Sequence, residues 1–123
     1  MTMRFLVLVH LDESAGEAGP PSASMLEAMT AFRADTTHGT FLDDGGLLPP
    51  PAAVRVRTSG GTTTVLDGPF AESKEVIGGF FVVESPSTDD VAIWSEGFVA
   101  LHAEHWPALT FTAEVRQIVD GAP

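Results

Sequence analysis

Two segments of the chain are apolar on both faces of the strands that they predict, and this feature constrains the fold most strongly. They are residues 5–9, which read FLVLV, and residues 76–83, which read VIGGFFVV. Alternate side chains of a strand point to opposite faces of a sheet, so both strands need apolar cover on both sides. Two helices are predicted, and two helices cover one face of a sheet. We therefore expect a second copy of the chain to cover the other face, in a homodimer.

The two helices are predicted from apolar residues that recur at helical spacing. The first falls in residues 22–37, where Ser22 or Ser24 can cap its start and Gly39 can end it. The second falls in residues 87–105, which begin with a capping hydroxyl and two acidic residues. Both patterns favour amphipathic helices packed on one face of a sheet.

A β-hairpin is predicted in residues 52–68, because Arg55 and Arg57 alternate with valines ahead of a Ser-Gly-Gly turn. Shorter patterns predict strands in residues 40–51 and 109–119. If the hairpin is an insertion, the remaining elements follow the order βαββαβ. We therefore expect one α+β domain over residues 1–123, with ferredoxin-like topology and an inserted β-hairpin, assembled as a dimeric α+β barrel.

The composition excludes several classes of function. The chain has 123 residues and no cysteine, so disulfides, thiolate zinc sites and cysteine nucleophiles are excluded. Its 17 acidic and 6 basic residues argue against partners that are nucleic acids or anionic membranes. The apolar run at the start is too short to span a membrane and lacks the cleavage site of a signal peptide. We expect a cytoplasmic protein without a bound metal or cofactor.

Residues 67–84, DGPFAESKEVIGGFFVVE, resemble the signature of the DGPF proteins, a branch of the YCII-related family. That signature reads Asp-Gly-Pro-Phe-Ala-Glu, then Thr or Ser, then Lys-Glu, and continues into a Gly-Gly pair and an apolar strand. Weaker similarities extend over most of the chain, among them VRVR at 54–57 and EVR at 114–116. The resemblance implies a ferredoxin-like fold, a dimer and a pocket between the sheet and a loop.

The resemblance implies less about activity. Members of the wider family carry a histidine and an aspartate thought to be catalytic, and a few relatives act on small ring compounds. Some similar proteins occur beside, or fused to, sigma factors. The family histidine belongs on the first helix, but residues 22–37 contain none and His38 lies only at the end of that segment. The histidine–aspartate pair is therefore not carried over to this chain.

Asp67 is the first candidate for the site. In an Asp-Gly-Pro turn, its carboxylate can accept backbone N–H bonds and fix the loop. Alternatively, it lies at the mouth of a pocket and acts as a general base or a ligand anchor.

The residues after this turn offer a similar choice. Lys74, between Glu72 and Glu75, either completes a network that holds the loop or stabilises an anionic substrate. The glycine pair that starts at Gly78 predicts a bulge, close packing or the close approach of a ligand. We assign catalytic roles to Asp67 and Lys74, and the expected ligand contacts are Phe70, Glu72, Glu75 and Gly78.

The histidines complete the set of candidates. His10 ends the first two-sided strand, where it can serve as an acid or base in a dimer cavity or form a structural hydrogen bond. His102 and His105 are spaced as metal ligands can be, but no third ligand is evident nearby in the sequence. We favour an interaction of both with the negative end of the helix dipole.

Two functions remain open at this stage. The first is a cofactor-free lyase or isomerase that moves a proton on a small organic molecule, with Asp67 or His10 as base and Lys74 as its electrostatic partner. The alternative is a ligand-binding or regulatory module without turnover, linked to sigma-factor-dependent transcription. The sequence does not identify the ligand.

Overall fold

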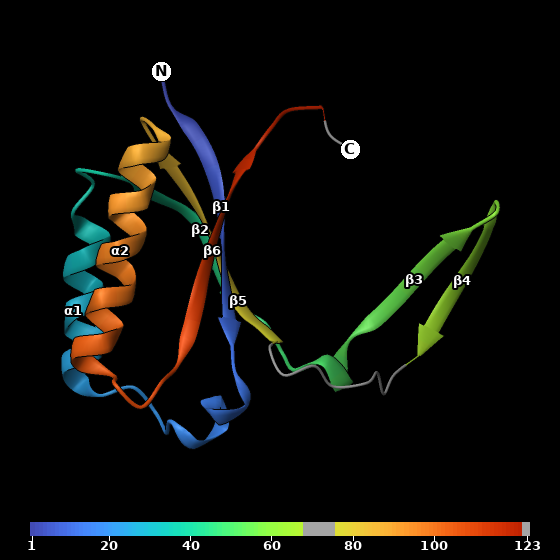
Figure 1. The fold of residues 1–123 in the computed structure, drawn as a ribbon, viewed down its shortest axis with the longest axis horizontal. Helices are drawn as coiled ribbons and strands as arrows, with labels where there is room; N and C mark the ends of the chain where they lie inside the picture. Colours follow the sequence, from blue (N-terminus) through green and yellow to red (C-terminus); the bar gives the residue numbers. More distant parts are fainter. Residues whose placement is uncertain (68–75, 122–123) are drawn as a thin grey trace.

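The chain forms an antiparallel sheet with two helices on one of its faces (Figure 1). This computed structural model describes residues 1–67 and 76–121, and the side chain of Asp67 is not among the described parts. The strands of the sheet are β1 (Met3–Leu11), β2 (Thr40–Gly46), β5 (Val76–Ser85) and β6 (Phe111–Ile118). The helices are α1 (Ala23–Ala34) and α2 (Thr88–His105), and two short 3-10 helices are η1 (Glu13–Glu17) and η2 (Pro50–Ala52).

The strand order β2-β5-β1-β6, with every neighbouring pair antiparallel, fits the predicted βαββαβ arrangement. The predicted hairpin is also confirmed, as β3 (Val54–Ser59) and β4 (Thr62–Asp67), inserted between β2 and β5. The chain is thus an α+β protein compatible with a ferredoxin-like fold. The dimeric barrel stays a prediction, because it involves a second chain.

The core lies between the sheet and the helices. Phe5, Val7 and Val83 of the sheet are almost completely buried, and α2 covers them with Val91, Trp94 and Phe98. The rings of Trp94 and Phe98 stack with their centroids 5.5 Å apart. Helix α2 therefore supplies the centre of the core, as its predicted apolar face requires.

The centre of the opposite face, on β1 and β5, is also apolar, in agreement with the sequence pattern, whereas Glu114 and Arg116 of the edge strand β6 share that face. Leu6 pairs across strands with Val82, and Leu8 with Phe80. These four side chains point away from the helices because they alternate with the buried ones. We call them the open face, and no helix or strand of residues 1–67 and 76–121 packs over it (Figure 1).

Two local expectations are wrong. Helix α1 begins after Ser22, whose hydroxyl accepts a 3.1 Å hydrogen bond from the Met25 N–H, but it ends at Ala34 rather than at Gly39. Gly39 is instead buried in front of β2, where an added Cβ would lie 2.8 Å from atoms of Trp94 and Val83. The second concerns residues 12–24, whose glycines and prolines predict a loop: residues 13–17 form the short helix η1 instead.

The glycine pair of β5 produces the bulge that was one of the predicted alternatives. Val9 pairs with Gly79 but His10 pairs with Ile77, so Gly78 is the extra residue. The shift turns Ile77 toward the face of His10, whereas strict alternation along the strand would place it on the face of Phe81 and Val83. Its side chain is accordingly 41% exposed.

Helix α2 begins in a polar cluster that gives the protein a pH-dependent contact. The Ser87 hydroxyl donates to Asp90 Oδ2 at 2.6 Å, and His38 Nδ1 lies 2.9 Å from Asp90 Oδ1. These hydrogen bonds, with that from Ser87 the stronger influence, lower the pKa of the Asp90 carboxyl from its usual 3.8.

We expect Asp90→Asn to remove part of the acid sensitivity of the fold. A carboxylate whose pKa is lowered in the folded state stabilises it above pH 3.8, and this contribution is lost as the pH falls through the lowered pKa. Urea unfolding at pH 7 and at several values below 4 measures the effect. The control is Asp89→Asn, in the same helical turn but exposed. Equal acid slopes in the two variants would contradict the expectation.

Candidate functional site

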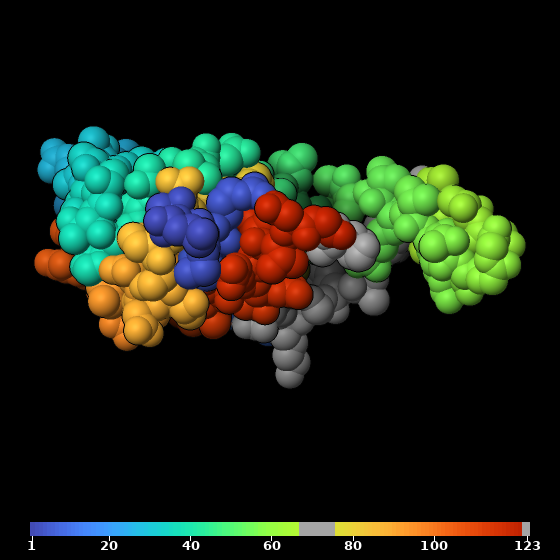
Figure 2. Space-filling model, turned by 90° about the horizontal axis from the view of Figure 1, so that it is seen from above, coloured from blue at the N-terminus to red at the C-terminus, as the bar shows by residue number. Residues whose placement is uncertain are grey.

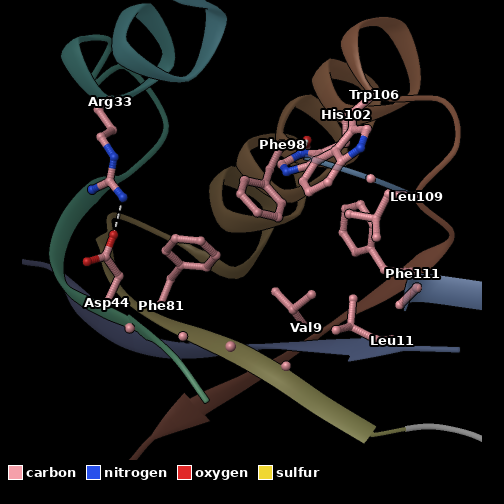
Figure 3. A pocket seen from close by; sticks show the side chains of 16 residues that line it. Val9, Leu11, Arg33, Asp44, Phe81, Phe98, His102, Trp106, Leu109 and Phe111 are labelled. Atoms are coloured by element: carbon pink, nitrogen blue, oxygen red, sulfur yellow. Dashed lines mark hydrogen bonds and ion pairs between the residues drawn. The ribbon is translucent and has the colours of Figure 1, made fainter. Parts of the chain in front are cut away.

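A cavity of about 490 Å³ lies on the helix side of the sheet, at the end where β1 stops and β5 begins (Figure 3). Its walls come from β1, β2, β5, β6, both helices and η1, so segments distant in sequence meet there. The apolar and aromatic lining consists of Val9, Leu11, Phe81, Phe98, Trp106, Leu109 and Phe111. A concave apolar space of this size is typical of small-molecule sites.

Backbone and side-chain hydrogen bonds hold parts of the cavity wall in place. The indole N–H of Trp106, just after α2, donates to the Ala18 carbonyl at 3.2 Å and ties α2 to the segment after η1. Opposite, the chain turns out of β2 at Gly46, and the Leu47 N–H donates to the Gly78 carbonyl at 3.0 Å. Ala15 and Gly19 line the same region. These two hydrogen bonds therefore fix the backbone beside the cavity wall.

His102 is the titratable side chain within the aromatic part of the cavity (Figure 3). Its ring lies 4.6 Å from that of Phe98 and 4.9 Å from that of Phe111, measured between centroids. Burial among these rings lowers the pKa of the imidazole, and a hydrogen bond to the Phe98 carbonyl only partly opposes this shift. The lowered pKa favours the neutral form of His102 at pH 7.

The hydrogen bond also fixes the tautomer of His102. Nδ1 lies 2.8 Å from the Phe98 carbonyl oxygen, and a carbonyl oxygen only accepts, so Nδ1 carries the proton. Nε2 of the neutral ring then carries a lone pair. Among the described residues Nε2 has no hydrogen-bond partner. The cavity thus presents one free imidazole acceptor to a bound molecule.

An ion pair between Arg33 and Asp44 marks the other side of the cavity (Figure 3). Arg33 comes from α1 and Asp44 from β2, and both side chains are partly exposed. The Arg33 guanidinium also lies 4.4 Å from the centre of the Phe41 ring, a cation–π distance. The cavity therefore has a charged side and an aromatic side.

Among the sequence candidates, Gly78 lines this cavity. His10 lies on the opposite face of the sheet, where its Nε2 is 2.8 Å from Glu114 Oε1. The structure therefore separates His10 from Gly78, and a contact of His10 with a dimer cavity remains a prediction.

The other candidates lie in or beside the signature loop. The backbone of Asp67 ends β4 and pairs with Val54, but its side chain is outside the described structure. Phe70, Glu72, Lys74 and Glu75 lie in 68–75, outside the described residues. Their predicted roles are untested.

His102 is the residue whose place in the site the sequence analysis missed. A signal was present, because Phe98 and His102 lie four residues apart on one face of α2 and Trp106 follows four residues later, just after the helix. The stripe by itself does not show that its far end faces a cavity. The favoured alternative, an interaction with the negative end of the helix, stays a prediction, since Nδ1 bonds the Phe98 carbonyl one turn earlier in α2.

The described residues define no other chemistry with comparable support. No group of three or more metal-ligating side chains occurs in 1–67 and 76–121. No helix in that part of the chain is long and apolar enough to cross a membrane. His105 bonds Ser24 at 3.2 Å and does not line the cavity.

A four-stranded antiparallel sheet, two helices on one face and an apolar end cavity define a small α+β protein with a ligand-sized pocket. The family model for the YCII-related domain matches residues 3–109, so the chain belongs to the YCII-related family. A search of curated proteins gives a similar, uncharacterised protein of Rhizobium meliloti (strain 1021). It is 34% identical over 91 residues, which cover 72% of this chain and 73% of that protein. The family predicted from residues 67–84 is confirmed, whereas the narrower DGPF branch stays a prediction.

Proposed function

We propose that the protein binds a small organic molecule in this cavity and moves a proton on it without a cofactor. The observation that carries the proposal is the lone pair of His102 Nε2 in a cavity of about 490 Å³ with aromatic walls. A neutral imidazole with a lowered pKa is a base that stays available below neutral pH.

The proposed step is an isomerisation or elimination. Nε2 takes a proton from an acidic C–H or O–H group, and the imidazolium returns it to another atom of the same molecule or to its leaving group. The negative charge that develops meanwhile needs a cation, for which Lys74 remains the candidate from the signature and Arg33 is a second. Asp67 is kept as a ligand anchor or second base.

We further propose that the protein is a cytoplasmic homodimer in which the open faces of two copies pack together. Support comes from the apolar side chains of Leu6, Leu8, Phe80 and Val82, which the described helices leave uncovered. Two sheets that pack face to face in this way would complete the predicted barrel.

Filling the cavity tests where ligands bind. A library of small aromatic and carbonyl compounds is screened by thermal shift, and hits are measured by calorimetry. Leu109→Trp adds bulk to the wall, so we expect it to weaken each hit by about tenfold or more, since overfilling a site costs about 1–3 kcal/mol.

The matched control is Leu48→Trp, at a position that is 81% exposed and does not line the cavity. Equal affinity of the two variants would place the binding site elsewhere. Hits that bind the cavity but are never turned over would leave the alternative, a ligand-binding or regulatory module.

A further inference from the structure

The β3–β4 hairpin is exposed along its whole described length although one of its faces is apolar. Val54, Val56 and Val65 are 70%, 64% and 61% exposed. The register pairs Val56 with Val65, so these two side chains share a face, and Val54 lies two residues along the same strand on that face. Three neighbouring valines exposed to water form an apolar patch of the kind that marks an interaction surface.

The hairpin has little support from the rest of the described chain. Within residues 1–67 and 76–121, β3 and β4 pack extensively only on each other, and their described side chains are exposed. Its turn is well made, since Gly60 and Gly61 have φ angles of 56° and 80°, as a two-residue hairpin turn requires. A lone two-stranded hairpin is nevertheless only marginally stable in water, so a straight, extended hairpin indicates a missing surface.

The direction of the hairpin indicates where that surface lies. It projects beyond the sheet on the side away from the helices, which is the side of the open face (Figures 1 and 2). The hairpin leaves β2 through the proline-rich η2, and Pro49, Pro50 and Pro51 restrict the backbone there. Anything that packs on the open face therefore lies beside the hairpin.

The charge of the hairpin is complementary to the rest of the chain. Arg55 and Arg57 are two of the six basic residues, whereas the hairpin holds only one of the 17 acidic residues, Asp67. A second copy of this acidic chain attracts a basic hairpin, and a two-fold axis would make the contact reciprocal.

We propose that this hairpin is an arm that grips the second subunit of the homodimer. The apolar face with Val56 and Val65 packs on the partner, and Arg57 lies toward its acidic surface. The inference rests on the dimer of the proposed function and adds a second contact to it. Each protomer contributes one arm, so every arm residue counts twice in the assembly.

The test compares dimer dissociation constants by sedimentation velocity over a dilution series. Val56→Thr with Val65→Thr keeps the β-branched shape and strand propensity but places hydroxyls in the contact. We expect dissociation to become easier by about tenfold or more, since the change acts in both arms. Arg57→Glu should weaken the dimer further at low salt and less at high salt.

The control is Leu26→Thr with Ile93→Thr, two exposed apolar positions on the helices, which should leave dissociation unchanged. Circular dichroism checks that the body of each variant stays folded. If Leu8→Asp on the open face splits the dimer but the arm variants do not, the arm is refuted and the proposed dimer stands. A wild-type protein that is monomeric at all concentrations refutes both, without affecting ligand binding in the cavity.

Discussion

Replacing Trp94 by alanine is expected to lower the free energy of unfolding by about 3–5 kcal/mol, the range for losing a large buried aromatic side chain. Trp94 is 3% exposed and forms ring contacts with Phe32, Phe41 and Phe98 at centroid distances of 5.3, 5.1 and 5.5 Å. Its removal leaves a cavity between α1, α2 and the sheet that these neighbours cannot fill without moving. Urea unfolding followed by circular dichroism measures the loss.

The control for this prediction is Ile93→Ala, the preceding residue on α2, which is 49% exposed. Because position 93 lies away from the core, Ile93→Ala should lower the free energy of unfolding by less than about 1 kcal/mol. Trp94→Phe separates volume from polarity, because Trp94 Nε1 is buried without an acceptor among the described residues. Removing the unsatisfied N–H offsets part of the stability lost with the smaller ring. Trp94→Phe should therefore lower the free energy of unfolding much less than Trp94→Ala. Equal costs at positions 93 and 94 would contradict the core described above.

The elements of this fold follow from local patterns in the sequence. The hairpin, the cap at Ser87 and the two-sided strands β1 and β5 each depend on residues close in the chain, and all are confirmed. Periodicity and turn chemistry report such local preferences well. The topology followed because only one simple arrangement suits the predicted order of strands and helices.

The errors arise where a distant contact decides the role of a residue. Gly39 was assigned to a helix end, yet its use is to let Trp94 and Val83 approach the backbone. Strict alternation along β5 would place Ile77 on the face of Phe81 and Val83, but the bulge at Gly78 turns it to the other face. Neither the approach nor the register is encoded within a short window of sequence.

In the site too, local sequence patterns point to some residues, and contacts between distant segments determine the role of others. The signature led attention to Asp67 and Lys74, because charged residues beside a glycine pair are conspicuous in a sequence. His102 is conspicuous only in three dimensions, where Phe98 and Phe111 surround its ring and the Phe98 carbonyl fixes its tautomer. A histidine within a helical apolar stripe reads as a packing residue until the space beside it is known.

The second large effect is expected at His102. His102→Phe keeps an aromatic ring against Phe98 and Phe111 but removes the Nε2 lone pair, so turnover of any substrate found by the screen should fall about 10²–10⁴-fold, the usual contribution of a general base. Affinity for the substrate should change far less than turnover, because the walls remain. Initial rates over a range of substrate concentrations separate the two effects.

The pH dependence of turnover and of stability provides an independent test of the role of His102. Turnover should hold as the pH falls below the usual histidine pKa and decline only through the lowered pKa of His102, which an NMR titration of the ring measures directly. Stability should behave differently. Below about pH 6.5 the unfolded chain takes up a proton that the folded ring resists, so the folded state loses stability, and His102→Phe should remove this loss.

The matched control is His105→Phe, three residues along α2, where the side chain faces Ser24 and Glu104 rather than the cavity. It should leave both turnover and its pH profile unchanged. A wild-type profile in His102→Phe would exclude the imidazole as the base and return that role to Asp67 or His10. A profile that is lost in both variants would instead indicate that aromatic substitution at the end of α2 disturbs the helix, which circular dichroism would detect.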